Sequence, residues 1–405
     1  MRVAVFTSRP PRAGTSFERE LRALARAGME IEVFALRPVV ARRRFEELAP
    51  PHARVHHLDL RRSARSAGGV VRHRLSPAMR DGGAMLASAA RGGLGPLAKT
   101  AYVLPQAWAW AAAAGPRFDH VLAYRDDSAG TCAYAFHRLL PRPVPFSLWV
   151  HGGGARRREP VYFRQKLAHA DLVITCCEAN RALLARAMPD LRDPVLAKTH
   201  VSHHGLDLAA YPYRAEGRNP HRAVVVGRLG KGKGMEDLLR AVFLVRVRGV
   251  ELVVDLVGDG PQRDRLQALA VALGLGDRVR FRGAMRRADA RQTMREAALL
   301  VHPAEGPGEG LPGAVPEAMA LGTPVVAAAV GGVPDALARG CGVLVPPRDE
   351  TTLADAIAGL LADPAARRRI AARARMRAQE RFDLWKNGAR LAELMRRAPG
   401  AEAPC

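Results

Sequence analysis

Residues 222–260 read RAVVVGRLGKGKGMEDLLRAVFLVRVRGVELVVDLVGDG and carry the clearest fold signal in the chain. The apolar runs at 223–226 and 252–257 have the length and the β-branched content of buried strands. Between them, residues 235–247 place apolar side chains at helical spacing. Strand, helix and strand in this order predict a βαβ unit, whose two strands lie parallel in one sheet.

The same alternation continues on both sides of this stretch. Strand-like runs separated by helix-length segments lie at 1–8, 30–38, 119–124, 145–152, 170–177, 277–285, 298–306 and 323–332. A Pro- and Gly-containing polar stretch at 209–221 reads as a linker between two series. The 405-residue chain therefore predicts an α/β fold with two Rossmann-like, doubly wound parallel-sheet domains. We expect domains at 1–208 and 209–384, with a C-terminal helix at about 385–405 that can pack back on the first.

The loop after the strand at 223–226 reads GRLGKGKG and combines small residues with positive charge. Ligands of doubly wound sheets bind at the carboxyl ends of the strands, which makes this loop a candidate site. Its glycines permit close approach of the backbone to a ligand. Its basic residues precede a helix N-terminus, which also favours anions. The residues of the loop are Gly227, Arg228, Gly230, Lys231, Gly232, Lys233 and Gly234. The loop matches neither the Walker motif nor the G-x-G-x-x-G fingerprint, and a solvated turn remains the alternative.

A second candidate segment is EGLPGAVPE at 309–317, with a glutamate at each end. If the interval were helical, its eight residue steps would separate Glu309 from Glu317 by ~12 Å. A retaining glycosidase needs its two carboxylates about 5 Å apart. The spacing suits two carboxylates that bind hydroxyl groups at distant points of one elongated ligand, and two ordinary surface acids are the alternative. Pro316 has no evident role in either interpretation.

Other residues give weaker signals. His151 stands at the end of a strand, where a side chain commonly faces a ligand site. Asp126 and Asp127 form an acidic pair, but no further carboxylate accompanies them, so we expect no metal site there. The absence of a G-x-S-x-G motif argues against a hydrolase with a Ser-His-Asp triad. The five cysteines include no C-x-x-C pair, which favours buried thiols over redox or zinc chemistry.

The chain is strongly basic, with a formal net charge of +24. Its first 200 residues hold 32 Lys and Arg against 16 Asp and Glu, so the excess is concentrated there. Such charge favours an anionic substrate or an anionic membrane surface, to which the basic segment 61–98 could bind; a coding bias towards arginine is the bland alternative. Aromatic residues are only 5% and no nucleic-acid-binding motif occurs, so we expect no nucleic-acid partner. The arginines of the C-terminal helical region are expected to form a solvated face.

No uncharged apolar run reaches the ~18 residues of a membrane-spanning helix. The apolar core of the start, MRVAVFTSRP, is too short for a signal peptide. We therefore expect a cytoplasmic protein, with peripheral association at the inner face of the membrane as a further prediction.

Together, the motifs of the second half resemble glycosyltransferase family 4, the retaining nucleotide-sugar enzymes of the GT-B fold. VGRLGKGKGMEDLLRA, LVGDGPQRDRLQALAVALGLGDRVRFRG and EGLPGAVPEAMALGTPVVAAAVGGVPDAL are similar, in order and spacing, to three motifs of that family. The resemblance covers about 222–390. The first half is similar, more loosely, to family members from bacterial exopolysaccharide clusters, with RAGTS in place of their P-S-E-T-F. Asp335 also replaces a glutamate that is usual in the family.

The resemblance implies two domains that face each other across a cleft, an acceptor-binding first domain and a donor-binding second domain. It assigns His151 and Glu309 to the reacting sugar as catalytic residues. It assigns donor binding to Gly14, Arg228, Lys233, Gly283, Ala284, Gly310, Leu311 and Glu317. Arg228 and Lys233 would neutralise the diphosphate, Glu317 would bind the ribose hydroxyls, and no metal would be required. The resemblance implies no cofactor beyond the nucleotide-diphosphate sugar itself, a UDP-sugar being favoured over a GDP-sugar.

The sequence thus predicts a metal-independent, retaining hexosyltransferase that acts on a saccharide, lipid-linked or small-molecule acceptor. Two alternatives remain open at this point. One is a nucleotide-sugar epimerase with the same fold, which the paired glutamates disfavour. The other is a non-enzymatic basic protein that binds an anionic surface.

Overall fold

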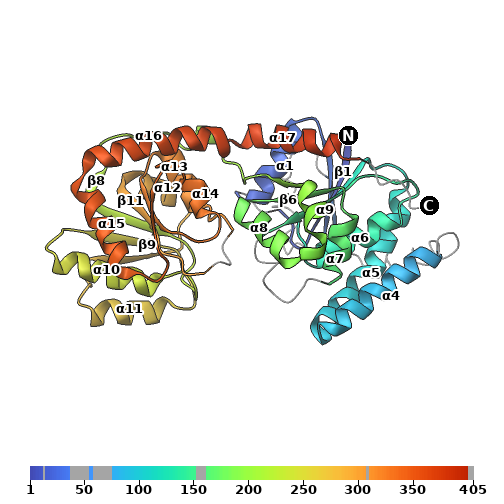
Figure 1. The fold of residues 1–405 in the computed structure, drawn as a ribbon, viewed down its shortest axis with the longest axis horizontal. Helices are drawn as coiled ribbons and strands as arrows, with labels where there is room; N and C mark the ends of the chain where they lie inside the picture. Colours follow the sequence, from blue (N-terminus) through green and yellow to red (C-terminus); the bar gives the residue numbers. More distant parts are fainter. Residues whose placement is uncertain (12–13, 37–53, 58–74, 152–160, 307–309, 400–405) are drawn as a thin grey trace. The chain divides into compact units, whose positions relative to one another are not determined.

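We describe a computed structural model of the protein, in which the described residues are 1–11, 14–36, 54–57, 75–151, 161–306 and 310–399. The chain forms two compact units (Figure 1). Unit 1 consists of Met1–Gly205 together with Leu384–Cys405, and unit 2 of Leu206–Asp383. The C-terminal segment therefore belongs to the same unit as the N-terminus.

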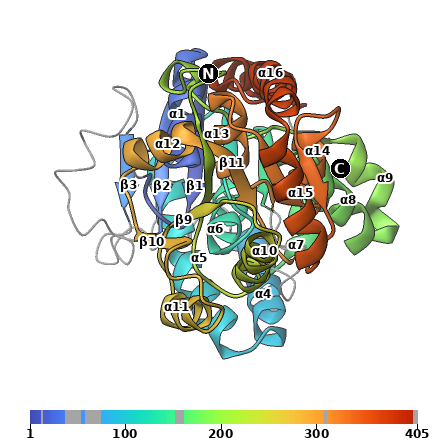
Figure 2. The same cartoon turned by 90° about the vertical axis from the view of Figure 1, so that its left-hand side faces the viewer.

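Unit 1 is built on a parallel sheet with seven strands in the part of the chain that is described. Its strands lie in the order β3-β2-β1-β4-β5-β6-β7, and Figure 2 shows β3, β2 and β1 side by side. The strands are β1 (Arg2–Thr7), β2 (Glu30–Ala35), β3 (Arg54–His57), β4 (His120–Ala123), β5 (Phe146–Val150), β6 (Leu172–Thr175) and β7 (Thr199–Val201). The helices are α1 (Ser16–Arg26), α4 (Leu75–Arg91), α5 (Leu94–Ala114), α6 (Ser128–Arg138), α7 (Phe163–His169), α8 (Glu178–Ala187), α9 (Arg192–Ala197) and α17 (Leu384–Arg397), with a 3-10 turn at Pro189–Leu191.

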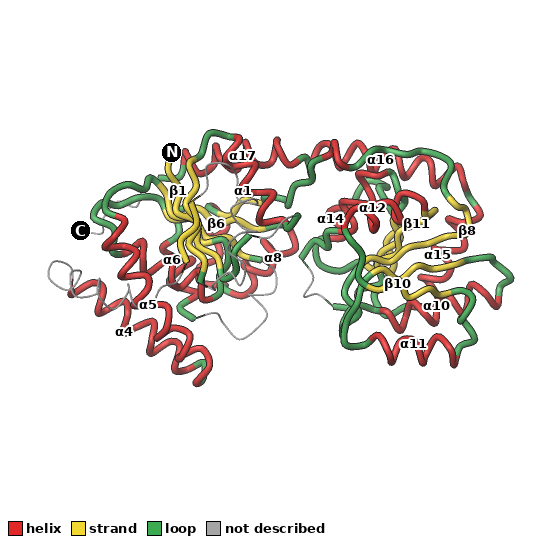
Figure 3. Tube along the Cα trace, turned by 180° about the vertical axis from the view of Figure 1, so that it is seen from behind, coloured by secondary structure: helices red, strands yellow, loops and turns green. Residues whose placement is uncertain are grey.

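The two faces of this sheet are both buried, as the apolar strand sequences require. Along β1, Ala4 and Phe6 join a core shared with α4, α5 and α6, whereas Val3 and Val5 join a second core shared with α1 and α17. This alternation is the two-residue period of a strand. Figure 3 shows the strands enclosed between helices.

Unit 2 repeats the plan with six described strands in the order β10-β9-β8-β11-β12-β13, again all parallel. The strands are β8 (Asn219–Val226), β9 (Val253–Val257), β10 (Val279–Gly283), β11 (Ala297–His302), β12 (Val325–Ala328) and β13 (Val343–Val345). The helices are α10 (Met235–Val247), α11 (Arg263–Ala272), α12 (Arg287–Glu296), α13 (Ala314–Leu321), α14 (Val333–Leu337), α15 (Glu350–Ala362) and α16 (Pro364–Arg381), with a 3-10 turn at Leu208–Ala210. Helices α10, α11 and α15 cover one face, and α12, α13, α14 and α16 cover the other (Figure 1).

The strand order reverses direction at one place in each sheet. In unit 1 the chain moves outward from β1 to β2 and β3, and then returns to place β4 on the other side of β1. In unit 2 the same reversal lies between β8 and β11. In doubly wound sheets, the crevice outside the carboxyl ends of such a strand pair is where ligands bind. The topology thus points to two places, one in each unit.

Some elements differ from what the sequence suggested. The polar sequence RVHH at 54–57 forms edge strand β3, which sequence patterns did not reveal because its side chains are only partly buried. The predicted linker at 209–221 overlaps β8, which already begins at Asn219. Of the basic segment 61–98, the structure describes residues 75–98, which form α4 and the start of α5; the preceding part lies outside the described residues.

Helix α17 is attached to unit 1 by a close contact between helix backbones. Its Leu391, Ala392 and Met395 pack into the core beside α1. Gly388 is buried there, and a Cβ atom at this position would lie 2.3 Å from the Cβ of Ala23 in α1. Real Cβ atoms do not approach so closely, so the absence of a side chain at position 388 allows the two helices to pack.

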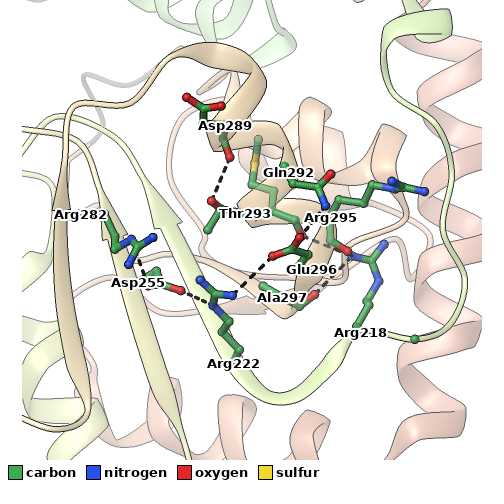
Figure 4. A network of polar contacts seen from close by, with 12 residues as sticks. Arg218, Arg222, Asp255, Arg282, Asp289, Gln292, Thr293, Arg295, Glu296 and Ala297 are labelled. Carbon is green, nitrogen blue, oxygen red and sulfur yellow. Dashed lines mark hydrogen bonds and ion pairs between the residues drawn. The ribbon is translucent and has the colours of Figure 1, made fainter.

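An ion-pair network stabilises the first strands of unit 2 (Figure 4). The carboxylate of Asp255 on β9 is fully buried, accepts a hydrogen bond from Arg222 on β8, and lies 3.7 Å from Nε of Arg282 on β10. Arg222 also pairs with Glu296 at the end of α12, at 3.6 Å. The network joins three neighbouring strands and one helix. A buried carboxylate such as Asp255 is tolerated because two guanidinium groups compensate its charge.

We predict that Gly388→Ala destabilises the chain although alanine is the better helix former. Gly359 in α15 is the matched control, because a Cβ at this exposed helical position meets nothing within 4 Å. Gly359→Ala should stabilise by about 0.5–1 kcal/mol through helix propensity alone. Thermal unfolding of both variants tests this, and a stabilised Gly388→Ala variant would contradict the packing argument.

We also predict that Asp255→Asn lowers the free energy of unfolding by about 3 kcal/mol, because it leaves the largely buried Arg222 with only its more distant partner Glu296. The control is Asp289→Asn, which removes the carboxylate of the exposed Arg286–Asp289 pair on α12. That change should alter stability by less than about 1 kcal/mol. Urea unfolding of the two variants measures the difference, and equal effects would refute a special role for the Asp255 network.

Candidate functional site

In unit 2, the loops that follow β8 and β11 are joined directly at the topological reversal. The amide of Glu305 donates to the carbonyl of Gly232 at 3.1 Å, and the amide of Gly234 donates to a carboxylate oxygen of Glu305 at 3.1 Å. Gly234 has a φ of +64°, and a Cβ there would lie 1.6 Å from the carbonyl oxygen of Pro303. Glycine is therefore required at 234 both by conformation and by space.

The neighbouring loops at the same edge are joined by further backbone hydrogen bonds. The amide of Gly227 donates to Val257 at 3.0 Å, and the amide of Gly258 donates to Gly283 at 2.8 Å. These contacts place the ends of β8, β9 and β10 in one continuous rim. By contrast, a Cβ at Gly227 or Gly232 would meet nothing within 4 Å, so these two glycines border open space. The rim is rigid where loops touch and open where a ligand could enter.

Positive charge is concentrated on this rim. Arg228 is exposed, and Lys233 is half-buried at the last turn before α10. Burial, and then the nearby charge of Arg228, lower the pKa of Lys233. Burial together with the charge of Lys233 lowers the pKa of His302, at the end of β11, to about 4. A bound anion would relieve the repulsion between these groups, which is the electrostatic property expected of a phosphate site.

The second glutamate of EGLPGAVPE lies in the first turn of α13, and Glu309 lies outside the described residues. Pro316 is the third residue of this helix. A proline is tolerated there, because the first turn of a helix does not use its amide hydrogens for intrahelical bonds. The ring of Pro316 is buried on the side of the helix that faces the core. Pro316 is thus explained by helix initiation and packing.

Most of the predicted donor-binding residues come together at this edge of unit 2. Gly310 accepts a hydrogen bond from the amide of Gly332, which links it to the loop after β12. Leu311 packs against the core and Ala284, the residue after β10, is exposed. Arg228, Lys233 and Gly283 lie in the neighbouring loops described above. The other two predicted residues, Gly14 and His151, belong to unit 1.

In unit 1, a cavity of about 780 Å³ lies at the topological reversal between β1 and β4. Its lining comes from the loops after β1, β2 and β4, and from α1 and α5. Gly14 precedes α1 with a φ of +73°; its amide donates to Glu18 at 3.2 Å, and its carbonyl accepts from Arg19 at 2.9 Å. The sheet edge therefore presents a pocket at the position where such folds bind ligands.

His151, directly after β5, lies in a stack of rings. It is stacked with Trp149 at 5.7 Å and with His204 at 5.4 Å between ring centroids, and Tyr124 lies 5.1 Å away. Nδ1 of His151 has no hydrogen-bond partner among the residues that the structure describes. Burial, followed by the positive charges of His204 and Arg125, lowers the pKa of His151 well below its ordinary value. His151 is thus a neutral imidazole near pH 7.

Glu20 of α1 connects two members of this ring stack by hydrogen bonds. Its carboxylate accepts hydrogen bonds from both the hydroxyl of Tyr124 and Nδ1 of His204. Burial lowers the pKa of His204, but the charge of Glu20 and hydrogen bonds to Glu20 and Cys176 outweigh it and raise the pKa to about 10. A protonated His204 therefore stacks on a neutral His151.

The acidic pair that follows β4 has a structural role. Asp127 caps α6 and Asp126 is buried; burial raises the pKa of Asp126 to about 6 although Lys166 opposes the shift. Nowhere in the described ranges do three His, Cys, Asp or Glu side chains converge as metal ligands would. Cys132, Cys176, Cys177 and Cys341 are buried free thiols.

Sequence reasoning missed Glu20, His204 and the cationic lining of the unit 1 cavity. Glu20 is hidden in an amphipathic helix, where a glutamate ordinarily faces water. The doublet His203–His204 follows β7, and its position after a strand was the available signal. Arg125 directly precedes the acidic pair Asp126–Asp127. Because two adjacent carboxylates suggest a metal site, the sequence pattern gave no indication of a role for the arginine.

Comparisons with known proteins agree with this architecture. Residues 214–377 match the family described as Glycosyl transferases group 1. Glycogen synthase of Mycobacterium tuberculosis is 32% identical over 238 residues, which are 58% of this chain and 56% of that protein. The chain thus spans about half the length of this curated relative.

Solved structures share the whole fold at low sequence identity. Sucrose-phosphate synthase from Thermosynechococcus elongatus has a TM-score of 0.71 and 23% identity, with 98% of both chains covered. HepE of Anabaena in complex with UDP has a TM-score of 0.69 and 20% identity, with 98% of this chain and 99% of that chain covered. The predicted fold class, GT-B with two Rossmann-like parallel-sheet domains, is confirmed. In the described part of the chain, no helix has the length and apolarity needed to cross a membrane.

The pair Glu20–His204 makes a prediction about pH. The pKa of His204 rises from its ordinary value of 6.5 in the unfolded chain to about 10 in the fold. The pair therefore contributes fully to the free energy of unfolding below pH 6.5, and this contribution is lost as the pH rises towards 10. We expect the parent chain to exceed Glu20→Gln in stability at pH 6 and the difference to shrink by pH 10. The exposed Glu30, paired with Arg2, provides the control Glu30→Gln.

Urea unfolding at each pH measures this difference. Comparing parent and variant removes the contribution of Lys166, whose lowered pKa of about 8 affects both chains alike. A difference that is the same at pH 6 and pH 10 would contradict the assignment of a protonated His204.

Proposed function

We propose that this protein is a retaining glycosyltransferase, which transfers a sugar from a nucleotide-diphosphate sugar to an acceptor hydroxyl. The observation that supports it most is the cationic rim of unit 2. There, Arg228 and Lys233 stand on a glycine-rich loop at the topological reversal, beside open space at Gly227 and Gly232. A diphosphate fits this arrangement because its charges meet two cations and the N-terminus of α10.

The transfer reaction needs positive charge beside the leaving nucleoside diphosphate. As the bond between the anomeric carbon and the diphosphate oxygen breaks, negative charge develops on the leaving nucleoside diphosphate. Arg228 and Lys233 would stabilise it without a metal ion. The acceptor oxygen forms the new bond to the anomeric carbon on the same face, and the proton of the acceptor hydroxyl leaves with the diphosphate. Attack on this face retains the anomeric configuration.

The remaining predicted residues have assigned roles in this proposal. Glu317, in the first turn of α13, would accept hydrogen bonds from the ribose hydroxyls. Glu309 and the amides of Gly310 and Leu311 would bind the hydroxyls of the sugar. His151, kept neutral by its surroundings, would contact the reacting sugar. Gly283, the last residue of β10, and Ala284, which follows it, would face the base.

The family match and the relatives support this proposal. Another relative, of Catenulispora acidiphila, is a glycosyltransferase by name, and HepE was solved with bound UDP. A UDP-sugar is therefore the donor to test first. The proposal also includes three properties of the protein: a role in exopolysaccharide synthesis, a cytoplasmic location, and peripheral binding to the inner face of the membrane.

The test measures nucleotide binding and release with purified protein. Calorimetry with UDP, GDP and ADP identifies the nucleotide, and the corresponding UDP-, GDP- and ADP-hexoses are then assayed for nucleotide release. We expect Arg228→Ala and Lys233→Ala each to lower the rate by roughly 100-fold, as the removal of a group that stabilises transition-state charge commonly does. Arg248→Ala, which removes an exposed arginine at the opposite, C-terminal end of α10, is the control and should retain nearly full activity.

Full activity of the Arg228→Ala variant would refute the assignment of the diphosphate site. Incubation of the donor alone, followed by NMR of its sugar, separates the proposal from an epimerase. An epimerised nucleotide sugar in the absence of acceptor would show that the site isomerises its substrate instead of transferring it.

A further inference from the structure

The cavity of unit 1 holds three cationic side chains that the donor chemistry does not use. Arg9 follows β1, Lys99 lies on α5 and Arg125 follows β4, so they come from three separate segments. All three are exposed. Among the described residues none of them has a carboxylate partner, in contrast to arginines such as Arg142, which pairs with Asp119 at 2.7 Å. Three unpaired cations at one opening attract an anion.

The carboxylate that lines the same cavity, Asp127, is already engaged. Its Oδ1 accepts hydrogen bonds from the hydroxyl of Ser8 at 2.7 Å and from the amide of Ala129 at 2.9 Å. It also caps α6, where the helix N-terminus compensates its charge. Asp127 offsets at most one of the three positive charges, so the cavity keeps an excess of positive charge.

The loop that carries Arg125 is fixed by buried contacts. A Cβ at Gly130 would lie 2.6 Å from the carbonyl oxygen of Arg125, so α6 packs directly on this peptide. Next to it, the fully buried amine of Lys166 donates to the carbonyl of Asp126 at 3.1 Å and to the hydroxyl of Thr131 at 3.3 Å. A cation on a fixed backbone loses less conformational freedom when it binds an anion. This support distinguishes Arg125 from an arginine on a free surface.

The size and the other lining residues limit the occupant. A volume of about 780 Å³ is that of a small-molecule site. Leu36, Val103 and Phe17 supply an apolar wall, and Ser16 and Ser128 add hydroxyl groups. Such a lining suits a sugar, whose ring has apolar faces and hydroxyl edges, provided that the sugar carries a negative charge for the cations.

One side chain, Tyr124, separates the cavity from the predicted catalytic histidine. Tyr124 lines the cavity and its ring lies 5.1 Å from the ring of His151. The charge of Arg125 is near enough to contribute, after burial and His204, to the low pKa of His151. A ligand held in the cavity thus contacts Tyr124, whose ring packs on the residue that we assign to the reacting sugar.

We propose that this cavity binds the acceptor, and that the acceptor carries an anionic group, a phosphate or a carboxylate, held by Arg125, Lys99 and Arg9. This inference rests on the proposed function, because it specifies the acceptor of the same reaction. It also gives a use to part of the positive charge that is concentrated in the first half of the chain.

The experiment titrates the full chain, saturated with UDP to occupy the donor site, with inorganic phosphate, glucose 6-phosphate, glucuronate and glucose. Calorimetry should show binding of phosphate and of at least one charged sugar, with glucose at least tenfold weaker. Arg125→Gln and Lys99→Gln should each weaken anion binding about tenfold, as the loss of a charge-assisted hydrogen bond does. Arg142→Gln removes the same charge elsewhere in unit 1 and should leave the affinity unchanged.

The binding measurements distinguish the possible anionic groups and test the acceptor inference separately from the proposed function. Preference for phosphates over glucuronate, or the reverse, identifies the anionic group. Equal binding of glucose and the anions, no anion binding at millimolar concentration, or an equal effect of Arg125→Gln and Arg142→Gln overturns the acceptor inference. If UDP itself fails to bind, the proposed function fails; if UDP binds and the anions do not, only the acceptor inference fails. Unchanged thermal unfolding of the variants shows that they are folded.

Discussion

The close approach of Gly234 to the carbonyl of Pro303 is the constraint on which the loops at the carboxyl edge of the unit 2 sheet depend. At this point the loop after β8 passes so close to the chain after β11 that no side chain can be accommodated. The hydrogen bonds from Glu305 to Gly232 and from Gly234 to Glu305 then fix the loop from both sides. Lys233 lies between these anchored residues, so its position follows from the backbone and not from its own flexible stem. A glycine-rich loop here is thus rigid in place, although glycine is the most flexible residue in an isolated chain.

The two units apply one topology to two different electrostatic tasks. In both, the strand order reverses beside the first strand, and the loops at that reversal carry arginine or lysine. In unit 2 the cations Arg228 and Lys233 lie on a loop that backbone hydrogen bonds join to the neighbouring loops. In unit 1 the cations line a cavity together with Tyr124, whose hydroxyl donates to Glu20, the partner of a protonated His204. Burial, with the charge of His204 second, keeps His151 neutral, and in unit 2 burial together with the charge of Lys233 lowers the pKa of His302.

The fold was predictable from sequence because parallel strands buried on both faces leave a strong local signal. Runs such as AVVV at 223–226 and LVVDLV at 252–257 cannot be mistaken for surface segments. The strands that escaped notice are β3, β7 and β13. Each lies at the edge of its sheet and has only three or four residues. The residues that we propose to bind the donor follow strands within short, glycine-marked loops, so the sequence could place them at one edge of the unit 2 sheet, and their role stays a prediction. The unit 1 site was not predictable, because Glu20, Lys99 and Arg125 are brought together by tertiary packing from segments that carry no common motif.

The arginines illustrate how structure separates a composition bias from a function. The sequence suggested that those of the C-terminal helical region form a solvated face, but several of them serve the backbone. Arg377 is buried and donates to the carbonyls of Ala336 and Asp335, and Arg375 donates to the carbonyls of Tyr211 and Ala320. Unpaired carbonyls at chain turns accept such donors readily, and the guanidinium group has five. Once the arginines that serve carbonyls or carboxylates are set aside, unpaired cations such as Arg9 and Arg125 remain at the carboxyl edge of the unit 1 sheet. That location, and not the total charge of +24, is what connects the basic composition to an anionic ligand.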